Sequence, residues 1–276
     1  MGKIVFVGAG SMAEAIIAGI VDCGVMSPDD IYVMNKSDDE RLHYMQQTYG
    51  VSILCPERKA LHEADLVVLA TKPKDIYQAM KDIVDELNEK SAVLSVIAGV
   101  PISTIEKGLG KRPIARSMPN TSATIGKSAT GVSWNSAIDA QLQDRIVELL
   151  SSIGIVKQVN EDQLHAVTAL SGSGPAYVYY MVEALEEAAV EEGLSKEVAR
   201  ELVIQTFVGA AAMLKQKGEE PALLRKNVTS PNGTTEAGIK ALERNSFKRI
   251  IAECVHSAEI RSRELGYLSS PAPKKE

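Results

Sequence analysis

The feature that most constrains the fold is a glycine-rich stretch near the start of the chain. Residues 3–7 (KIVFV) are mostly β-branched and apolar, and residues 8–13 (GAGSMA) follow at once with the spacing G-x-G-x-x-A. An apolar run with helical spacing begins at Met12. A strand, a glycine turn and a helix in this order form the context in which such glycines bind the pyrophosphate of a dinucleotide. The chain is therefore predicted to begin with a Rossmann-type nucleotide-binding domain.

The residues of this fingerprint have distinct expected roles. Gly8 permits the tight turn, Gly10 lets the backbone approach a pyrophosphate, and Ala13 allows the helix to pack closely on the sheet. Free N–H groups at the helix N-terminus then face the anion. The predicted cofactor-binding residues of this turn are Gly8, Ala9, Gly10, Ser11, Met12 and Ala13. A purely structural turn is the alternative, and the flanking strand and helix make it the weaker one.

The end of the predicted second strand indicates which dinucleotide binds. NAD-binding domains usually place Asp or Glu here to hold the ribose hydroxyls, whereas this strand is followed by Asn35, Lys36 and Ser37. An amide, a cation and a hydroxyl suit a 2′-phosphate, which a carboxylate would repel. NADPH is the predicted cofactor, and NADH is the alternative because Asp38 or Asp39 could still reach a ribose.

Two further loops leave the carboxyl ends of predicted strands, where ligands of parallel α/β sheets bind. Their small residues leave room for a flat ring such as nicotinamide. The predicted cofactor contacts are Ala70, Thr71, Lys72 and Pro73 in the first loop and Val96, Ile97 and Ala98 in the second. For the first loop, a strand end followed by a helix start is the purely structural alternative.

The apolar pattern divides the chain into two parts. Up to about residue 160, apolar runs alternate with amphipathic helical runs, which is typical of a parallel sheet covered on both faces. Strands are predicted at residues 3–7, 31–34, 51–54, 66–70, 92–97, 114–118, 131–133 and 155–159, and helices at 12–23, 75–89 and 139–153. Farther along, only helices are predicted, at 175–192, 195–217, 234–244 and 246–265.

These patterns predict an α/β Rossmann-type nucleotide-binding domain followed by an all-α dimerisation domain. The boundaries are residues 1–160 and 161–268, with a disordered Pro-rich tail at 269–276. The helical part has few aromatic residues and thin apolar faces, so we expect it to pack against a second copy of itself.

Composition argues against several partners. The net charge is -6 and the basic residues are scattered, which disfavours nucleic acid. No apolar run approaches the roughly 20 residues of a membrane-spanning helix. The cysteines Cys23, Cys55 and Cys254 form no CxxC pair and the histidines are dispersed, so no metal site is predicted. Because no export signal is visible, a cytoplasmic location is expected.

Several longer stretches resemble the Δ1-pyrroline-5-carboxylate reductase family. They are VGAGSMAEAI (7–16), ATKP (70–73), RSMPNT (116–121), SGSGPAYVYYMVEAL (171–185) and, most specifically, LRKNVTSPNGTTEAGIKALE (224–243). The resemblance implies reduction of 1-pyrroline-5-carboxylate to L-proline with NAD(P)H, the final step of proline biosynthesis. It also implies a homodimer with interlocking helical domains, active sites built from two chains, and a higher oligomer as an open alternative.

The same resemblance implies that the turn at residues 228–235 and the helix after it hold the substrate. Carried over by position, the backbone N–H groups of Gly233 and Thr234 bind the carboxylate, the Thr235 hydroxyl contacts the ring nitrogen, and Ser230 shapes the pocket. Thr235 is the predicted catalytic residue, which polarises and orients the imine rather than transferring a proton. An exposed helix start suits a carboxylate, and a capped helix is the structural alternative.

The sequence departs from the family pattern at two positions. Asn232 stands where the family usually has Gly, and Asn tolerates positive φ. Arg58 stands near a family asparagine of the cofactor site, where it either adds positive charge or has no role. Arg116 and Asn120 are expected either to border the nicotinamide or to pack at a strand end.

Two other functions are weighed against this one. The β-hydroxyacid dehydrogenases share the layout but need a general-base lysine on an early helix of the second domain, and residues 171–193 contain no lysine. A nucleotide-binding regulator without activity would be expected to have lost Thr235, Gly233 or the fingerprint, and all are present.

Overall fold

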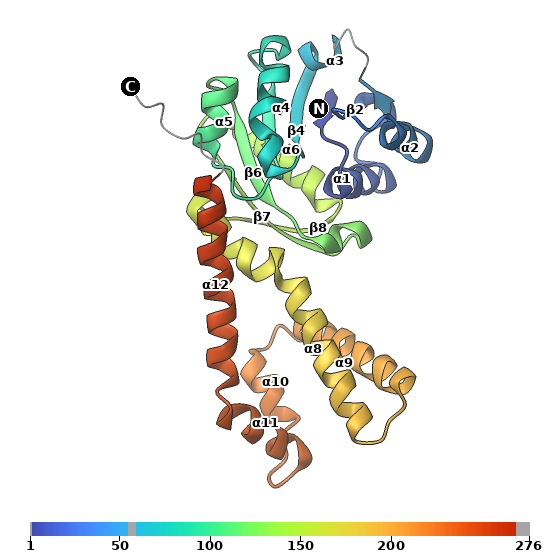
Figure 1. Cartoon of the computed structure of the whole chain (residues 1–276), viewed down its shortest axis with the longest axis vertical. Coiled ribbons are helices and arrows are strands. Elements are labelled where there is room, and N and C mark those ends of the chain that lie inside the picture. The colour runs from blue at the N-terminus through green and yellow to red at the C-terminus, as the bar shows by residue number, and fades with distance from the viewer. Residues whose placement is uncertain (1, 55–58, 269–276) are drawn as a thin grey trace. The chain divides into compact units, whose positions relative to one another are not determined.

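The computed structural model describes residues 2–54 and 59–268 (Figure 1). By its internal contacts the chain divides into two compact units. Unit 1 contains the residues up to Ser173 together with those from Ser257 onward, and unit 2 is Gly174–His256. The unit boundary therefore falls thirteen residues after the change in sequence pattern at 160 and returns inside the last helix.

Unit 1 is built on an eight-stranded sheet of order β3-β2-β1-β4-β5-β6-β7-β8. All neighbouring strands are parallel except β6 and β7. The strands are β1 (Lys3–Val7), β2 (Ile31–Met34), β3 (Ser52–Ile53), β4 (Ala64–Leu69), β5 (Ala92–Ser95), β6 (Ile114–Met118), β7 (Ser128–Trp134) and β8 (Gly154–Gln158). Its first six strands have the Rossmann order, which confirms the predicted fold class. The order in which strands are added to the sheet reverses between β1 and β4, and such folds bind their ligands at this point.

Helices cover both faces of this sheet (Figure 1). One hydrophobic cluster joins the sheet to α1 (Ser11–Asp22), α2 (Asp39–Tyr49) and α6 (Ala140–Ser151), and the other joins it to α3 (Lys59–His62), α4 (Ile76–Ile83) and α5 (Ile102–Leu109). Strand β1 serves both, since Ile4 and Phe6 belong to the first cluster and Val5 and Val7 to the second. Burial on both faces explains why these strands are continuous apolar runs.

One predicted helix of unit 1 is shorter than expected. The run at 75–89 forms α4 only as far as Ile83, and a single 3-10 turn at Val84–Glu86 follows. Leu87 then adopts an extended conformation and is buried. Placing Leu87 in the core therefore ends the helix earlier than its periodicity indicates.

After β8, unit 1 continues with a short helical segment. It consists of α7 (Leu164–Val167) and a π-helical turn at Thr168–Gly172, which leads into α8. The residues of α12 from Ser257 onward also belong to this unit.

Unit 2 consists of helices joined by turns, and its described residues include no strand. It holds α8 (Gly174–Glu191), α9 (Lys196–Lys217), α10 (Pro221–Asn227), α11 (Thr234–Arg244) and the first part of α12 (Phe247–Leu268). Ser195 caps α9 by accepting a hydrogen bond from Val198 N at 3.4 Å, and Gly218 ends that helix with φ of 62°. Arg200 on α9 binds Glu186 on α8 through two hydrogen bonds of 2.8 and 3.1 Å.

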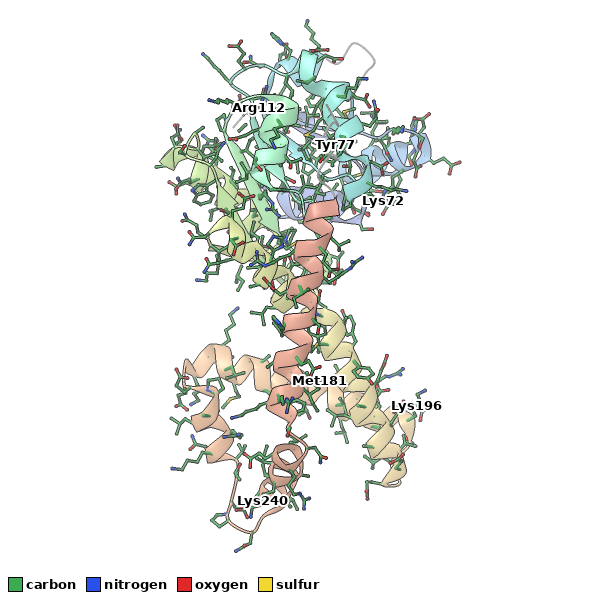
Figure 2. All side chains as sticks on the ribbon, turned by 60° about the vertical axis from the view of Figure 1, so that its left-hand side comes forward. Lys72, Tyr77, Arg112, Met181, Lys196 and Lys240 are labelled. Carbon is green, nitrogen blue, oxygen red and sulfur yellow. The ribbon has the colours of Figure 1, made fainter. Side chains whose placement is uncertain are left out.

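Unit 2 has almost no core of its own. Among its described residues, only Glu186 and Ala199 are buried. Many large apolar side chains are exposed, among them Tyr179, Tyr180, Leu185, Leu202, Ile204, Val208, Met213 and Ile250. Met181 on α8, Lys196 on α9 and Lys240 on α11 mark these helices in Figure 2. So large an apolar surface is typical of an interaction face.

No helix in the described part of the chain has the length and hydropathy to cross a membrane.

Candidate active site

The fingerprint turn has the geometry that its first glycine predicts. Gly8 has φ of 109°, and its N–H donates to Met34 O at 2.9 Å. A Cβ at this position would lie 2.6 Å from Ala70 O. Both the backbone conformation and the neighbouring strand therefore require glycine at position 8.

At position 10, neither the backbone conformation nor packing requires glycine. Gly10 is the N-cap of α1 with φ of -73° and ψ of 178°, a conformation open to any residue, and no side chain caps the helix. A Cβ at Gly10 would meet Ala70 O only at 4.0 Å. Packing within the chain does not require glycine here, so the small residue leaves space in front of free N–H groups. Ala13, one turn later, is fully buried against the sheet.

Arg41 supports this turn from α2, and sequence analysis missed it. Its Nε donates to Ala9 O at 2.9 Å, and its guanidinium pairs with Glu14 on α1. Tyr49 Oη donates to Glu14 Oε1 at 2.9 Å. Burial acts to raise the pKa of Glu14, but the hydrogen bonds from Arg41 and Tyr49 outweigh burial and lower that pKa below its ordinary value. The acidic residue at the start of α1 is therefore charged and neutralised by its partner.

Asp38 and Asp39, the two carboxylates that could hold the ribose of NADH, have different positions after β2. Asp38 is the N-cap of α2 and accepts a hydrogen bond from Arg41 N at 2.9 Å, so its carboxylate already caps a helix. Asp39 is exposed in the first turn. Asn35 Oδ1 accepts from Lys36 N at 2.8 Å, which folds this turn, and Lys36 is exposed.

The other two cofactor loops lie beside the fingerprint. Ala70 N donates to Val7 O at 2.9 Å, and Val96 N donates to Leu69 O at 3.0 Å. These bonds place both loops at the carboxyl ends of β1, β4 and β5. Lys72, labelled in Figure 2, is exposed.

Thr71 provides a test of whether a dinucleotide fits. Its Oγ1 is one of two buried side-chain oxygens that lack a hydrogen-bond partner among the described residues. Buried hydroxyls are nearly always hydrogen-bonded. Together with the uncapped start of α1, this oxygen fits a bound polar ligand at the loop.

In unit 2, the turn before α11 also ends in an uncapped glycine. Gly233 is the N-cap with φ of -86° and ψ of 172°, and no side chain caps the helix. Asn232 has φ of 59°, a left-handed backbone conformation that Asn adopts more readily than most residues. A Cβ at Gly233 would lie 2.4 Å from Ser230 Oγ, which shows how tightly this turn is closed.

The hydrogen bonds of this turn show which of its polar groups already have a partner within the chain. Gly233 N donates to Ser230 O at 3.1 Å, while Thr229 Oγ1 donates to Arg225 O at 2.6 Å. Helix geometry leaves the N–H groups of Thr234 and Thr235 without intrahelical carbonyls. Both threonines are exposed. The free donors therefore begin one residue later than expected, at Thr234 rather than Gly233.

Glu236 completes the turn. Its carboxylate accepts a hydrogen bond from Asn232 N at 2.9 Å and pairs with Lys240 at 3.1 Å. The backbone bond from Asn232, followed by the Lys240 contacts, lowers the pKa of Glu236 below its ordinary value. Like Glu14, it is an acidic residue near a helix start whose charge is balanced locally.

Comparisons with known proteins find matches to both parts of the chain. A family model described as pyrroline-5-carboxylate reductase dimerisation matches residues 161–265. A second, described as NADP oxidoreductase coenzyme F420-dependent, matches residues 3–99. Pyrroline-5-carboxylate reductase 2 of Bacillus subtilis is 46% identical over 268 residues, which are 96% of this chain and 95% of that protein. The chain belongs to the pyrroline-5-carboxylate reductase family.

Solved members of the family have the same fold. The pyrroline-5-carboxylate reductase of Coxiella burnetii matches with a TM-score of 0.90 and 39% identity, covering 96% of this chain and 98% of that one. The Plasmodium falciparum pyrroline carboxylate reductase, solved with NADP bound, matches with a TM-score of 0.84 and 28% identity over 96% and 98%. The protein is thus an NAD(P)H-dependent oxidoreductase that reduces the C=N bond of 1-pyrroline-5-carboxylate to give L-proline.

Arg116 and Asn120, given two alternatives above, both have partners within the chain. Arg116 is buried and pairs with Glu161 at 2.8 Å. Asn120 Nδ2 donates to Ser171 O at 2.9 Å, and its Oδ1 accepts from Ser122 N at 3.1 Å. These bonds favour the structural alternative for this pyrroline-5-carboxylate reductase. Arg58 and the tail at 269–276 lie outside the described residues.

Proposed function

We propose that this reductase prefers NADPH and works as a homodimer, with the turn at 228–235 as its substrate site. The observation that carries the proposal is the start of α11. There, free N–H groups, two exposed threonines and a glycine turn coincide with the most specific family stretch. Residues 1–160 would bind the nucleotide and residues 161–268 would bind substrate and the second subunit.

The nucleotide would be held by the three loops at the carboxyl ends of the strands. Gly8 to Ala13 would receive the pyrophosphate at the start of α1, because Gly10 leaves its N–H groups open. Asn35 and Lys36 would bind the 2′-phosphate, since Asp38 already caps α2. Residues 70–73 and 96–98 would border the nicotinamide, with Thr71 Oγ1 as a donor to it.

The chain's own groups then have simple tasks. Thr234 N–H and the start of α11 bind the substrate carboxylate, and Ser230 shapes the turn. The Thr235 hydroxyl orients the ring nitrogen, so the imine carbon faces the nicotinamide. When bound, the reduced nicotinamide supplies the hydride. Because a protonated imine is already electrophilic, orienting it within about 3–3.5 Å of the donor carbon accounts for most of the catalysis.

Dimerisation would follow from unit 2. Its exposed apolar side chains and the match to the family's dimerisation model support a partner of the same kind. We propose that the substrate turn of one subunit works with the nucleotide-binding loops of its partner, that dimers are able to assemble further, and that the protein is cytoplasmic.

The test of this proposal is an absorbance assay of NADPH or NADH oxidation with pyrroline-5-carboxylate. We expect stronger turnover with NADPH. Thr235→Val should lower kcat about tenfold, as expected for one lost hydrogen bond to a charged group, and Thr235→Ser should restore it. Stronger turnover with NADH would refute the Lys36 assignment. Unchanged kcat in Thr235→Val would refute the assignment of Thr235.

A further inference from the structure

The loop between β5 and α5, residues 96–101, is held by segments that come much later in the chain. Its first part carries the proposed nicotinamide contacts Val96, Ile97 and Ala98. One interaction reaches it from residues 161–165 and one from the end of α12, and further bonds join these two segments to each other, all within unit 1.

The first interaction is a close approach of two backbones. Gly99 has φ of 78° and is buried, and a Cβ on it would lie 3.3 Å from Gly266 N. A Cβ on Gly266 would lie 2.9 Å from Gly99 O. Gly266 stands inside α12, where glycine is less favourable than alanine. The helix therefore accepts an unfavourable residue so that it can touch the loop.

The second interaction fixes the end of the loop. Pro101, the N-cap of α5, provides no side-chain cap. Instead Glu161 Oε1 accepts a hydrogen bond from Ile102 N at 2.7 Å. The same oxygen accepts from Arg116 Nη1 at 2.8 Å, and Arg116 is buried. A residue beyond β8 thus caps the helix that follows the nicotinamide loop.

The third interaction ties α12 to the segment that contains Glu161. His165 Nδ1 lies 3.0 Å from Ser262 Oγ, which is buried. Arg263 donates to both carboxylate oxygens of Asp162, at 2.6 and 3.0 Å. His165 Cε1 would lie 3.6 Å from a Cβ on Gly266, so the ring also flanks the backbone contact.

We infer that Glu161, Ser262 and Gly266 are positioning residues, which set the place of the nicotinamide by fixing the β5–α5 loop. None of them needs to touch a ligand. This inference rests on the proposed function, because that proposal assigns the nicotinamide to residues 96–98. A displacement of about 1 Å at the reacting carbon is enough to cost about a hundredfold in rate, so a small shift of the loop has a measurable effect.

The experiment compares Gly266→Ala with Arg261→Ala. Arg261 lies on the same helix and pairs with Glu264 of that helix, so it is the matched control. Hydrogen exchange of residues 96–102 is measured without nucleotide. Binding of NADPH is compared with binding of adenosine 2′,5′-bisphosphate, which lacks nicotinamide, and kcat is measured with pyrroline-5-carboxylate. Ser262→Ala, which adds no atoms, serves as a milder second variant.

For Gly266→Ala we expect faster exchange at residues 96–102, an about tenfold lower kcat, and bisphosphate affinity within twofold of the parent. Ser262→Ala should change exchange and kcat in the same direction by about twofold, and Arg261→Ala should change neither. Parent-like exchange and kcat in Gly266→Ala would overturn the inference. So would equal losses of NADPH and bisphosphate binding, because these indicate damage to the whole domain.

Failure of the proposed function would look different. In the parent protein, NADPH would then slow exchange at residues 96–102 no more than adenosine 2′,5′-bisphosphate does, which would place the nicotinamide elsewhere. The exchange and binding measurements would still decide whether the end of α12 holds the loop.

Discussion

The start of α1 in unit 1 and the start of α11 in unit 2 share a backbone geometry. Gly10 and Gly233 are N-caps with φ, ψ of -73°, 178° and -86°, 172°, and neither helix has a side-chain cap. Elsewhere Asp38, Asp139 and Ser195 cap α2, α6 and α9 through hydrogen bonds. Leaving a cap off costs about 1 kcal/mol when the N-cap is apolar and less with glycine, and it preserves free N–H groups for an anion.

The surroundings of the two starts differ. Behind Gly10, α1 buries Ile16 and Ile17 completely, whereas α11 has no buried residue. Rigidity at Gly233 comes instead from its own turn, through Ser230 and the bond between Glu236 and Asn232 N. The two proposed anion sites therefore share an open helix start and a locally balanced acid, but not a core behind the helix.

The largest expected effect comes from a substitution at the start of α1. A Ser at position 10 finds open space and acts as a cap, so Gly10→Ser should keep Tm but weaken NADPH binding about a hundredfold, as expected for two lost charged hydrogen bonds. Fluorescence titration and thermal melts measure both. Gly8→Ser is the contrast and should lower Tm, because its Cβ would lie 2.6 Å from Ala70 O. Unchanged affinity in Gly10→Ser would mean that the pyrophosphate binds elsewhere.

A glycine-to-serine substitution at the start of α11 should weaken the binding of pyrroline-5-carboxylate rather than that of NADPH. A Cβ at Gly233 meets Ser230 Oγ at 2.4 Å and Ser230 O at 3.1 Å, so Gly233→Ser must move the Ser230 hydroxyl and crowds the turn. We expect the KM for pyrroline-5-carboxylate to rise about thirtyfold, in proportion to the lost carboxylate contacts, with the Kd of NADPH within twofold. Gly238→Ala, whose Cβ has nothing within 4 Å, is the control. A parallel rise in the Kd of NADPH would show that the two starts are not independent.

Lys36→Ala tests whether Lys36 binds the 2′-phosphate of NADPH. It removes one charge-assisted contact, so NADPH affinity should fall about tenfold. NADH has no 2′-phosphate, and its affinity should stay within twofold. Isothermal titration with both nucleotides gives the ratio, and equal losses would assign Lys36 to the fold of the turn.

The smallest expected effect comes from a substitution of Glu236 at the start of α11. Glu236→Gln keeps an acceptor for Asn232 N and removes a negative charge next to the proposed carboxylate site. The KM for pyrroline-5-carboxylate at neutral pH should therefore fall about twofold. A higher KM would mean that the charge of Glu236, rather than its hydrogen bond, maintains the turn.

The lowered pKa of Glu236 sets a pH window for this turn. A carboxylate whose pKa falls on folding stabilises the fold above the unfolded value and loses that effect as pH drops through the folded value. The ordinary value is 4.5 and the folded pKa lies below it. The protection factor of the Asn232 amide, which is its exchange rate relative to the intrinsic rate at each pH, should thus be constant from neutral pH to about 5 and fall in stronger acid, while the Gln variant should lack this fall.

The sequence predicts what is local and misses what is distant. The strand at residues 3–7 and the helix at 234–244 follow from periodicity, and the structure agrees. The tolerance of Asn232 for positive φ was inferred from the glycine that the family usually has there, and its φ is positive. Arg41 was missed because its bond to Ala9 spans 32 residues and leaves no short pattern.

The candidate sites show the same limit. Motif and resemblance located the start of α11, but only the hydrogen bonds show that Gly233 N–H is already engaged with Ser230 O. The bond between Ile102 N and Glu161 spans 59 residues, so no local pattern could reveal it. The helix predicted at 75–89 failed because burial of Leu87 outweighed helical periodicity.

The near absence of buried side chains in residues 174–256 has a consequence for how the protein is made. The nucleotide-binding unit has two hydrophobic clusters of its own, whereas the helical unit would gain its apolar burial by pairing with another copy. Assembly then acts as the last step of folding, and its yield rises with concentration. At low expression, degradation of unassembled chains would compete with pairing, so the cell would hold either whole enzyme or little of it.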